Sequence, residues 1–189
     1  MARDLKIGQV LLLPSDAPAE PPPSTSNGET LTDATIATIA KAVAQNEHRS
    51  WTSDKVHKDR IKAVTEILKA CNRHGVFDNA HRAYILATAY HETNLGQWMV
   101  EKWGPSSWQK KYGSKLGNRS DAEGFKYRGR GFVQITGRDH YRNYGDLYGK
   151  DFLSDPDQVS EYPLAADILV RGMNEIGFTG PSSTLSKYG

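Results

Sequence analysis

The chain has 189 residues, 38% of them hydrophobic and 10% aromatic, and its formal net charge at pH 7 is +2. A chain of this length and composition can bury one core, because roughly 100–200 residues make one domain. Its single cysteine, Cys71, excludes an intramolecular disulfide, and no apolar run approaches the roughly 18 residues that a membrane-spanning helix needs.

Residues 1–29 are expected to lie outside the folded domain. The apolar stretch Val10–Leu13 is too short for a convincing signal-peptide core, which favours a soluble protein made in a cytoplasm. Residues 14–29 are rich in proline and serine and are typical of an extended linker. The sequence therefore predicts one folded domain over residues 30–189.

Two amphipathic helices are predicted directly after the linker. The first is capped by Thr32 or Asp33, and the second runs from about Ser53 to near Gly75. Helical spacing predicts inward-facing side chains at Ile36, Ile39, Ala40 and Val43 in the first helix, and at Val56, Ile61, Val64, Leu68 and Cys71 in the second. Cys71 is thus expected to be a buried thiol rather than a nucleophile.

A third helix, entered after Asp78, is apolar on nearly every side and ends on the carboxyl group of Glu92. Helical spacing places Glu92 on one stripe with Ile85, Thr88 and Ala89. A carboxyl group in such surroundings loses hydration and holds its proton more tightly, which suits a general acid near neutral pH. The alternative is that the side chain extends into solvent at the helix end, the more common position for a glutamate.

Phe132–Thr136 has the composition of a β-strand and is followed by Gly137. Alternation along this strand places Val133 and Ile135 on the core face. The other face then carries the amide of Gln134 and a hydroxyl group, which can hold a water or a sugar hydroxyl. The alternative is an edge strand that shows polar side chains to solvent.

The remaining segments predict loops and two more helices. Repeated glycines over residues 104–124 predict loops, whereas residues 138–148 and 164–176 have helical patterns, the second with Pro163 near its start. The fold class expected from these elements is α+β, mainly α, with a small β element.

Positive charge is concentrated between Lys102 and Arg142, where ten basic and three acidic side chains give a local charge of +7. This segment favours an anionic partner, either nucleic acid or a bacterial wall with its peptide carboxylates; a solvated basic surface is the alternative. No metal site is expected, because Leu95 stands where the zinc-protease motif that begins at His91 requires a second histidine.

Four blocks of the sequence occur in a specific order: Tyr90-His91-Glu92-Thr93, Tyr127-Arg128-Gly129-Arg130-Gly131-Phe132-Val133-Gln134-Ile135-Thr136-Gly137-Arg138, Asp155-Pro156-Asp157 and Ala165-Ala166. In this order they resemble the family 19 glycoside hydrolases, and most of all the branch of phage endolysins and bacterial lysozyme-like enzymes. The resemblance covers about residues 55–188. It implies a lysozyme-like, mainly helical fold and cleavage of a β-1,4-linked amino-sugar polymer, with no cofactor.

The resemblance also implies the roles of individual residues. The general acid of the family maps to Glu92, and a second carboxylate in the loop that follows activates water. Glu101 fits this second role best, with Asp121 and Glu123 as alternatives. The hydroxyl group of Thr136 is expected to hold the attacking water. Substrate contacts are expected from Gln134, Tyr127, Arg128, His91, His140 and Trp103.

Some segments depart from the family or extend beyond it. His140 stands where the family often has asparagine, and the chain stops at Gly189, where relatives usually continue into another helix. Residues 4–14 resemble the closing strand of a LysM wall-binding module. Trp98, Trp103 and Trp108 are expected to be either core residues or a floor on which sugars stack.

The favoured hypothesis is a monomeric, inverting glycosidase whose partner is bacterial peptidoglycan rather than nucleic acid or a membrane. It would be made in the cytoplasm of a bacterial host and act on the wall. Inversion is expected because a loop can hold Glu101 at the roughly 6.5–9.5 Å from Glu92 that leaves room for a water. A chitinase is the second hypothesis, less favoured because chitin is neutral. A non-catalytic wall- or nucleic-acid-binding module is the third, disfavoured by the two acidic side chains.

Overall fold

The computed structural model describes residues 28–46, 53–102 and 112–175, and these residues are mainly helical, in agreement with a mainly α, lysozyme-like fold. The elements are α1 (Asp33–Asn46), α2 (Asp54–Arg73), α3 (Asn79–Thr93), α5 (Asp121–Lys126), α6 (Arg138–Tyr148), the 3-10 helix η2 (Pro156–Ser160) and α7 (Tyr162–Glu175). The expected LysM-like stub and linker, together with Trp103 and Trp108, lie outside the described residues.

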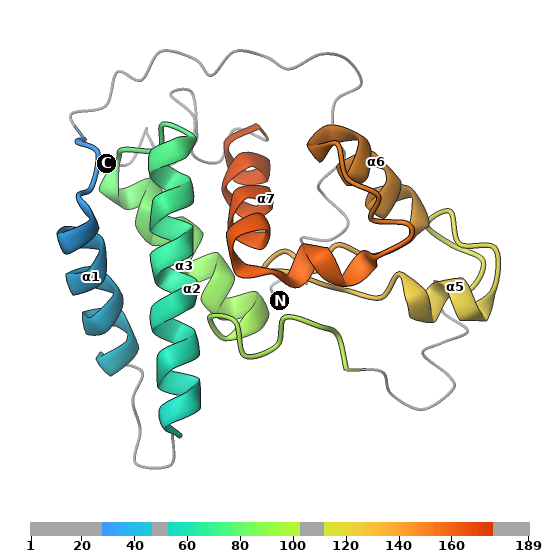
Figure 1. Cartoon of the computed structure of the whole chain (residues 1–189), viewed down its shortest axis with the longest axis horizontal. Coiled ribbons are helices and arrows are strands. Elements are labelled where there is room, and N and C mark those ends of the chain that lie inside the picture. Colours follow the sequence, from blue (N-terminus) through green and yellow to red (C-terminus); the bar gives the residue numbers. More distant parts are fainter. Residues whose placement is uncertain (1–27, 47–52, 103–111, 176–189) are drawn as a thin grey trace, which may run out of the picture.

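Helix α2 is the central element of the fold and packs against α1, α3 and α7 (Figure 1). It begins where the sequence predicts, because the Ser53 side chain accepts a hydrogen bond from the Val56 N–H group at 3.4 Å. Its apolar side is buried, and Cys71 is fully buried as predicted. Burial raises the pKa of the Cys71 thiol to about 12, so the thiol stays protonated at neutral pH.

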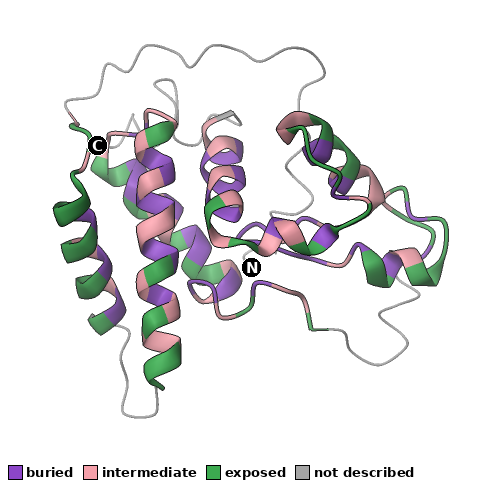
Figure 2. Ribbon diagram, viewed as in Figure 1, coloured by how far each residue is buried: buried purple, intermediate pink, exposed green. Residues whose placement is uncertain are grey.

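The other helices present one apolar side to this core. Figure 2 shows the buried residues of α1 on the side that faces α2, with exposed residues on the opposite side. Arg73 of α2 also donates a hydrogen bond to Asp167 of α7 at 3.0 Å, which ties these helices together near the surface. Over the described ranges, none of the helices combines the length and the apolar character needed to cross a membrane.

Residues 127–137 join α5 to α6 along the chain and pack between α6 and α7 (Figure 1). On one side, the Phe132 ring stacks on the Tyr162 ring of α7, with ring centroids 5.8 Å apart. On the other side, the Tyr127 ring lies 5.4 Å from the Tyr141 ring of α6. We call residues 127–137 the junction loop.

The prediction of a β-strand at Phe132–Thr136 is wrong. Residues 131–134 form a turn, in which the Gln134 N–H group donates to the Gly131 carbonyl at 3.2 Å. Both turn ends have left-handed backbone conformations, with φ of 76° at Gly131 and 52° at Gln134, which interrupt the alternation of a strand. Among the described residues, only isolated antiparallel bridges remain, Val100 with Arg130 and Arg130 with Ile135.

Helix α5 was not expected, because repeated glycines predict loops over residues 104–124. The helix is started by Ser120, whose hydroxyl oxygen accepts a hydrogen bond from the Glu123 N–H group at 3.2 Å. Gly124 lies inside the helix, where a Cβ atom would come within 3.2 Å of the Gly113 nitrogen. This glycine therefore allows α5 to pack closely on the preceding segment rather than ending a helix.

We expect Gly131→Ala to destabilise the protein more than Gly149→Ala does. Both glycines have positive φ, which costs other residues about 1–2 kcal/mol. A Cβ atom at Gly131 would also lie 2.6 Å from the Val159 carbonyl oxygen, whereas one at Gly149 would meet nothing within 4 Å. The measurement is the free energy of unfolding in urea for both variants. Equal losses would show that the junction loop yields to the added methyl group.

Candidate active site

The end of α3 holds Glu92 in a fixed position. Glu92 is half-buried in the last turn, and the next residue, Thr93, is fully buried with its hydroxyl donating to the Ala89 carbonyl at 2.8 Å. Asn94 then ends the helix with a left-handed φ of 50°, and its side-chain oxygen accepts a hydrogen bond from Arg60 at 2.9 Å. The Glu92 carboxyl group is therefore carried by a well-capped helix end rather than by a frayed one.

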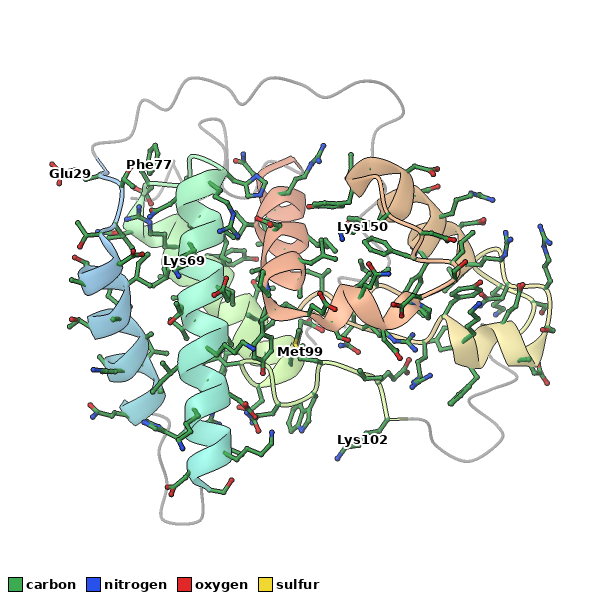
Figure 3. All side chains as sticks on the ribbon, viewed as in Figure 1. Glu29, Lys69, Phe77, Met99, Lys102 and Lys150 are labelled. Atoms are coloured by element: carbon green, nitrogen blue, oxygen red, sulfur yellow. The ribbon has the colours of Figure 1, made fainter. Side chains whose placement is uncertain are left out.

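Backbone hydrogen bonds attach the segment after α3 to the junction loop. The Gly131 N–H group donates to the Met99 carbonyl, and the Glu101 N–H group donates to the Gly129 carbonyl, both at 2.8 Å. Met99 points in among the helices, whereas Lys102 points away from them (Figure 3). The main chain at Glu101 is thus fixed against the junction loop immediately before the described segment ends.

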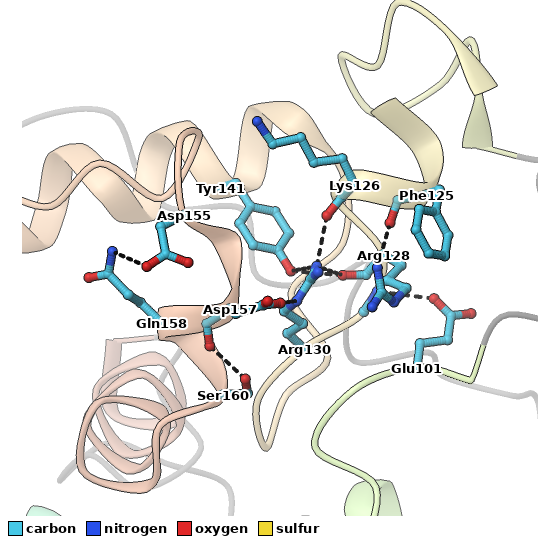
Figure 4. A network of polar contacts seen from close by, with 11 residues as sticks. Glu101, Phe125, Lys126, Arg128, Arg130, Tyr141, Asp155, Asp157, Gln158 and Ser160 are labelled. Carbon is cyan, nitrogen blue, oxygen red and sulfur yellow. Dashed lines mark hydrogen bonds and ion pairs between the residues drawn. The ribbon is translucent and has the colours of Figure 1, made fainter. Parts of the chain in front are cut away.

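The Glu101 side chain lies over the same part of the junction loop. Its Oε2 atom accepts a hydrogen bond from the Gly129 N–H group at 3.0 Å (Figure 4). A Cβ atom at Gly129 would lie 3.3 Å from Glu101 Oε2 and 2.7 Å from Gln134 Oε1. Only glycine therefore lets the carboxylate and the amide oxygen approach the same point. Burial and the negative charge of Glu101 raise the pKa of the nearby Tyr112.

Gln134 and Thr136 complete this group of polar atoms. The Gln134 amide nitrogen donates to the carbonyl groups of Trp98 at 3.2 Å and Gly131 at 2.9 Å. Its Oε1 atom accepts no hydrogen bond from any residue that the structure describes. The Thr136 hydroxyl donates to the Gln134 carbonyl at 2.8 Å, which leaves its oxygen able to accept. The structure thus brings together Glu101 and Gln134, with Thr136 attached through the backbone of Gln134.

Two of the expected substrate-binding residues make internal hydrogen bonds. Tyr127 is 4% exposed, and its hydroxyl donates to the Leu153 carbonyl at 3.2 Å. The Nδ1 atom of the half-buried His140 lies 2.7 Å from the Thr136 carbonyl oxygen, so it carries a proton and donates. These two side chains support the junction loop.

The other expected contacts differ in their accessibility. Arg128 is half-buried, with its guanidinium 4.3 Å above the Phe125 ring and one N–H group bonded to the Phe125 carbonyl at 3.1 Å. Burial and the positive charge of Arg130 lower the pKa of Arg128. His91 is exposed, and Trp103 lies outside the described residues.

The two alternative candidates for the catalytic base, Asp121 and Glu123, are on α5, and Glu123 already binds other side-chain and backbone groups of the protein. Glu123 accepts a hydrogen bond from the Arg119 N–H group at 2.8 Å and forms an ion pair with Arg138 at 3.5 Å. Asp121 is exposed in the first turn of the helix. Glu101, by contrast, lies with Gln134 around Gly129. Within the described ranges, no cluster of three or more His, Cys, Asp or Glu side chains could hold a metal ion.

Sequence reasoning did not find the groups that hold Glu101. The Gly129 N–H group is a backbone donor, and the side chains of Arg130 in the junction loop and Tyr141 on α6 are buried. The only signal in the sequence was an arginine between two glycines, a pattern that permits close approach of the backbone but does not reveal which atoms approach.

Comparison with known proteins gives a partial match. No protein-family model matches the chain. A segment of 51 residues is 41% identical to part of a "Glycosyl hydrolase family 19 domain-containing protein" from Haemophilus influenzae. The aligned segment covers 26% of this chain and 24% of that protein. This similarity supports the family 19 resemblance over about a quarter of the chain.

Proposed function

We propose that this protein is a glycoside hydrolase that cleaves β-1,4 bonds between amino sugars of bacterial peptidoglycan. The observation that carries the proposal is the position of Glu101, whose carboxylate is held by the Gly129 N–H group near the amide oxygen of Gln134. A carboxylate, a sugar-binding amide and a second carboxyl group on the capped end of α3 are the groups that such a reaction needs.

In the proposed reaction, Glu92 donates a proton to the leaving oxygen while the bond from that oxygen to the anomeric carbon breaks. A water attacks the same carbon from the opposite face, and Glu101 accepts the proton that this water loses. The Thr136 oxygen accepts a hydrogen bond from the water, and Gln134 Oε1 accepts one from a sugar hydroxyl. The products are two shorter glycans, the new reducing end having inverted configuration.

Two features favour wall glycan over chitin. Arg128 presents a guanidinium group that is already ordered by Phe125 and lies close enough to Glu101 to interact with its charge. Further basic side chains are exposed between residues 102 and 142: Lys102, Lys115, Arg119, Lys126 and Arg142, the last of which is paired with Asp139. Peptidoglycan carries carboxylates, whereas chitin is neutral, so these cations increase the affinity for the wall only.

The substrate assignment is tested by assaying the protein on purified bacterial sacculi and on chitin in parallel. We expect sacculi to lose turbidity, whereas chitin releases no soluble sugars. Release of sugars from chitin at an equal or higher rate would identify a chitinase. Pelleting with sacculi without any hydrolysis, by a protein shown to be folded, would identify a binding module and contradict the proposal.

A further inference from the structure

We infer that Arg130 and Tyr141 position the base for catalysis, by holding the carbonyl oxygen of the peptide unit whose N–H group binds Glu101. The inference rests on the proposed function, because it assigns these residues to the reaction that Glu101 serves. Both are positioning residues, since Arg130 lies within the junction loop and Tyr141 on α6, and both act on Glu101 through the backbone of this loop.

Arg130 is the centre of a buried network (Figure 4). Arg130 is 2% exposed, yet its hydrogen bonds to other described residues all end on oxygen acceptors, which suit a cation. Its Nε–H group donates to Asp157 at 2.7 Å, and its Nη1 atom donates to the carbonyl groups of Lys126 at 2.8 Å and Arg128 at 3.2 Å. A buried guanidinium is costly to desolvate, so such a group persists where its hydrogen bonds hold a particular backbone geometry.

Tyr141 adds a second donor to the same carbonyl group. Its ring is fully buried, and its hydroxyl donates to the Arg128 carbonyl at 2.7 Å while accepting from Arg130 Nη1 at 3.0 Å. Burial raises the pKa of Tyr141, so the hydroxyl keeps its proton and remains a donor over the pH range of the reaction. The Arg128 carbonyl oxygen is therefore held by a cation and a hydroxyl at once.

The Arg128 carbonyl and the Gly129 N–H group belong to one planar peptide unit. Fixing the oxygen of this unit fixes the direction of its N–H bond, which points at Glu101 Oε2 from 3.0 Å. Donation to the oxygen also polarises the unit and strengthens the N–H group as a donor. The hydrogen bonds thus run without a break from the Asp157 carboxylate, through Arg130 and the peptide unit, to the carboxylate of Glu101.

The test compares Tyr141→Phe with Tyr144→Phe. The first variant removes one of the two donors to the Arg128 carbonyl, whereas the second removes a buried hydroxyl from the same helix and leaves both donors in place. For Tyr141→Phe we expect kcat on sacculi to fall roughly 10-fold to 100-fold with KM within about twofold, because small misplacements of a catalytic group have effects of this size. Tyr144→Phe should keep the wild-type kcat.

Hydrogen exchange of the Gly129 amide provides a readout that does not depend on activity. Exchange should be faster in Tyr141→Phe than in Tyr144→Phe at matched global stability. Unchanged exchange, or an unchanged kcat, in a folded Tyr141→Phe protein would overturn the inference while leaving the proposed function in place. A wild-type protein that hydrolyses no sacculi would instead overturn the proposed function, and with it the role assigned to this network.

Discussion

Replacing Glu92 with glutamine should lower the rate of sacculus hydrolysis by roughly 10²–10⁴-fold, the usual contribution of general acid catalysis. Glutamine has the same shape but donates no proton to a leaving oxygen. The fold should persist, because Thr93 and Asn94 hold the end of α3 through contacts that do not involve Glu92. The measurement is the initial rate of turbidity loss, beside thermal unfolding and pelleting with sacculi.

Glu66→Gln is the matched control for this variant, because Glu66 is another half-buried glutamate on a helix of the same core, α2. It should keep the wild-type rate. If the Glu92→Gln variant is folded, binds sacculi and hydrolyses them at a rate within a few-fold of the wild-type rate, Glu92 is not the proton donor.

Replacing Glu101 with glutamine should lower kcat by a comparable factor while changing KM little, because activation of water is an interaction of the transition state. The amide oxygen of glutamine can still accept the hydrogen bond from the Gly129 N–H group, so the variant tests the charge and the basicity rather than the position of the side chain. Single-turnover rates on soluble wall fragments separate kcat from binding.

The alternative bases provide the controls for this second variant. Asp121→Asn and Glu123→Gln should retain most of the activity, and the amide introduced by Glu123→Gln would still offer an oxygen to the Arg119 N–H group. A fully active Glu101→Gln protein, together with an inactive variant at either position of α5, would transfer the base role to that residue.

The helices could be predicted because their signals are local. Ser53 and Asp78 cap α2 and α3 at the residues where the pattern of apolar side chains begins, and α6 covers the predicted residues 138–148. Such signals depend on a few neighbouring residues. They are therefore visible without knowledge of the tertiary structure.

The junction loop could not be predicted in the same way. Phe132–Thr136 has strand composition, but positive φ at Gly131 and Gln134 turns the chain, and Phe132 packs on a distant helix. Tertiary contacts override β-propensity here, as they commonly do. Likewise, the sequence predicts Arg130 to be part of an exposed basic segment. Its burial results from the packing of α6 and η2 around it.

The candidate site was predicted in part. The apolar helix makes Glu92 a candidate general acid beside the alternative of an exposed side chain, and the family resemblance points to Glu92, Glu101 and Gln134. The roles of these residues remain predictions, although the structure adds the contact between Glu101 and Gly129. Spacing along the chain could not reveal this contact, because it joins residues 28 positions apart through a backbone N–H group.

The most direct test of the proposed function is chemical analysis of the ends that the protein creates in purified sacculi. A glycosidase produces new reducing sugar ends and no new free amino groups, and we predict this result for the wild-type protein. The Glu92→Gln variant should produce new reducing ends far more slowly than the wild-type protein, and likewise no new amino groups. New amino groups without new reducing ends would mean that the protein cuts the peptide part of the wall, which would contradict the assignment of Glu92 and Glu101 as the acid and base of a glycosidase.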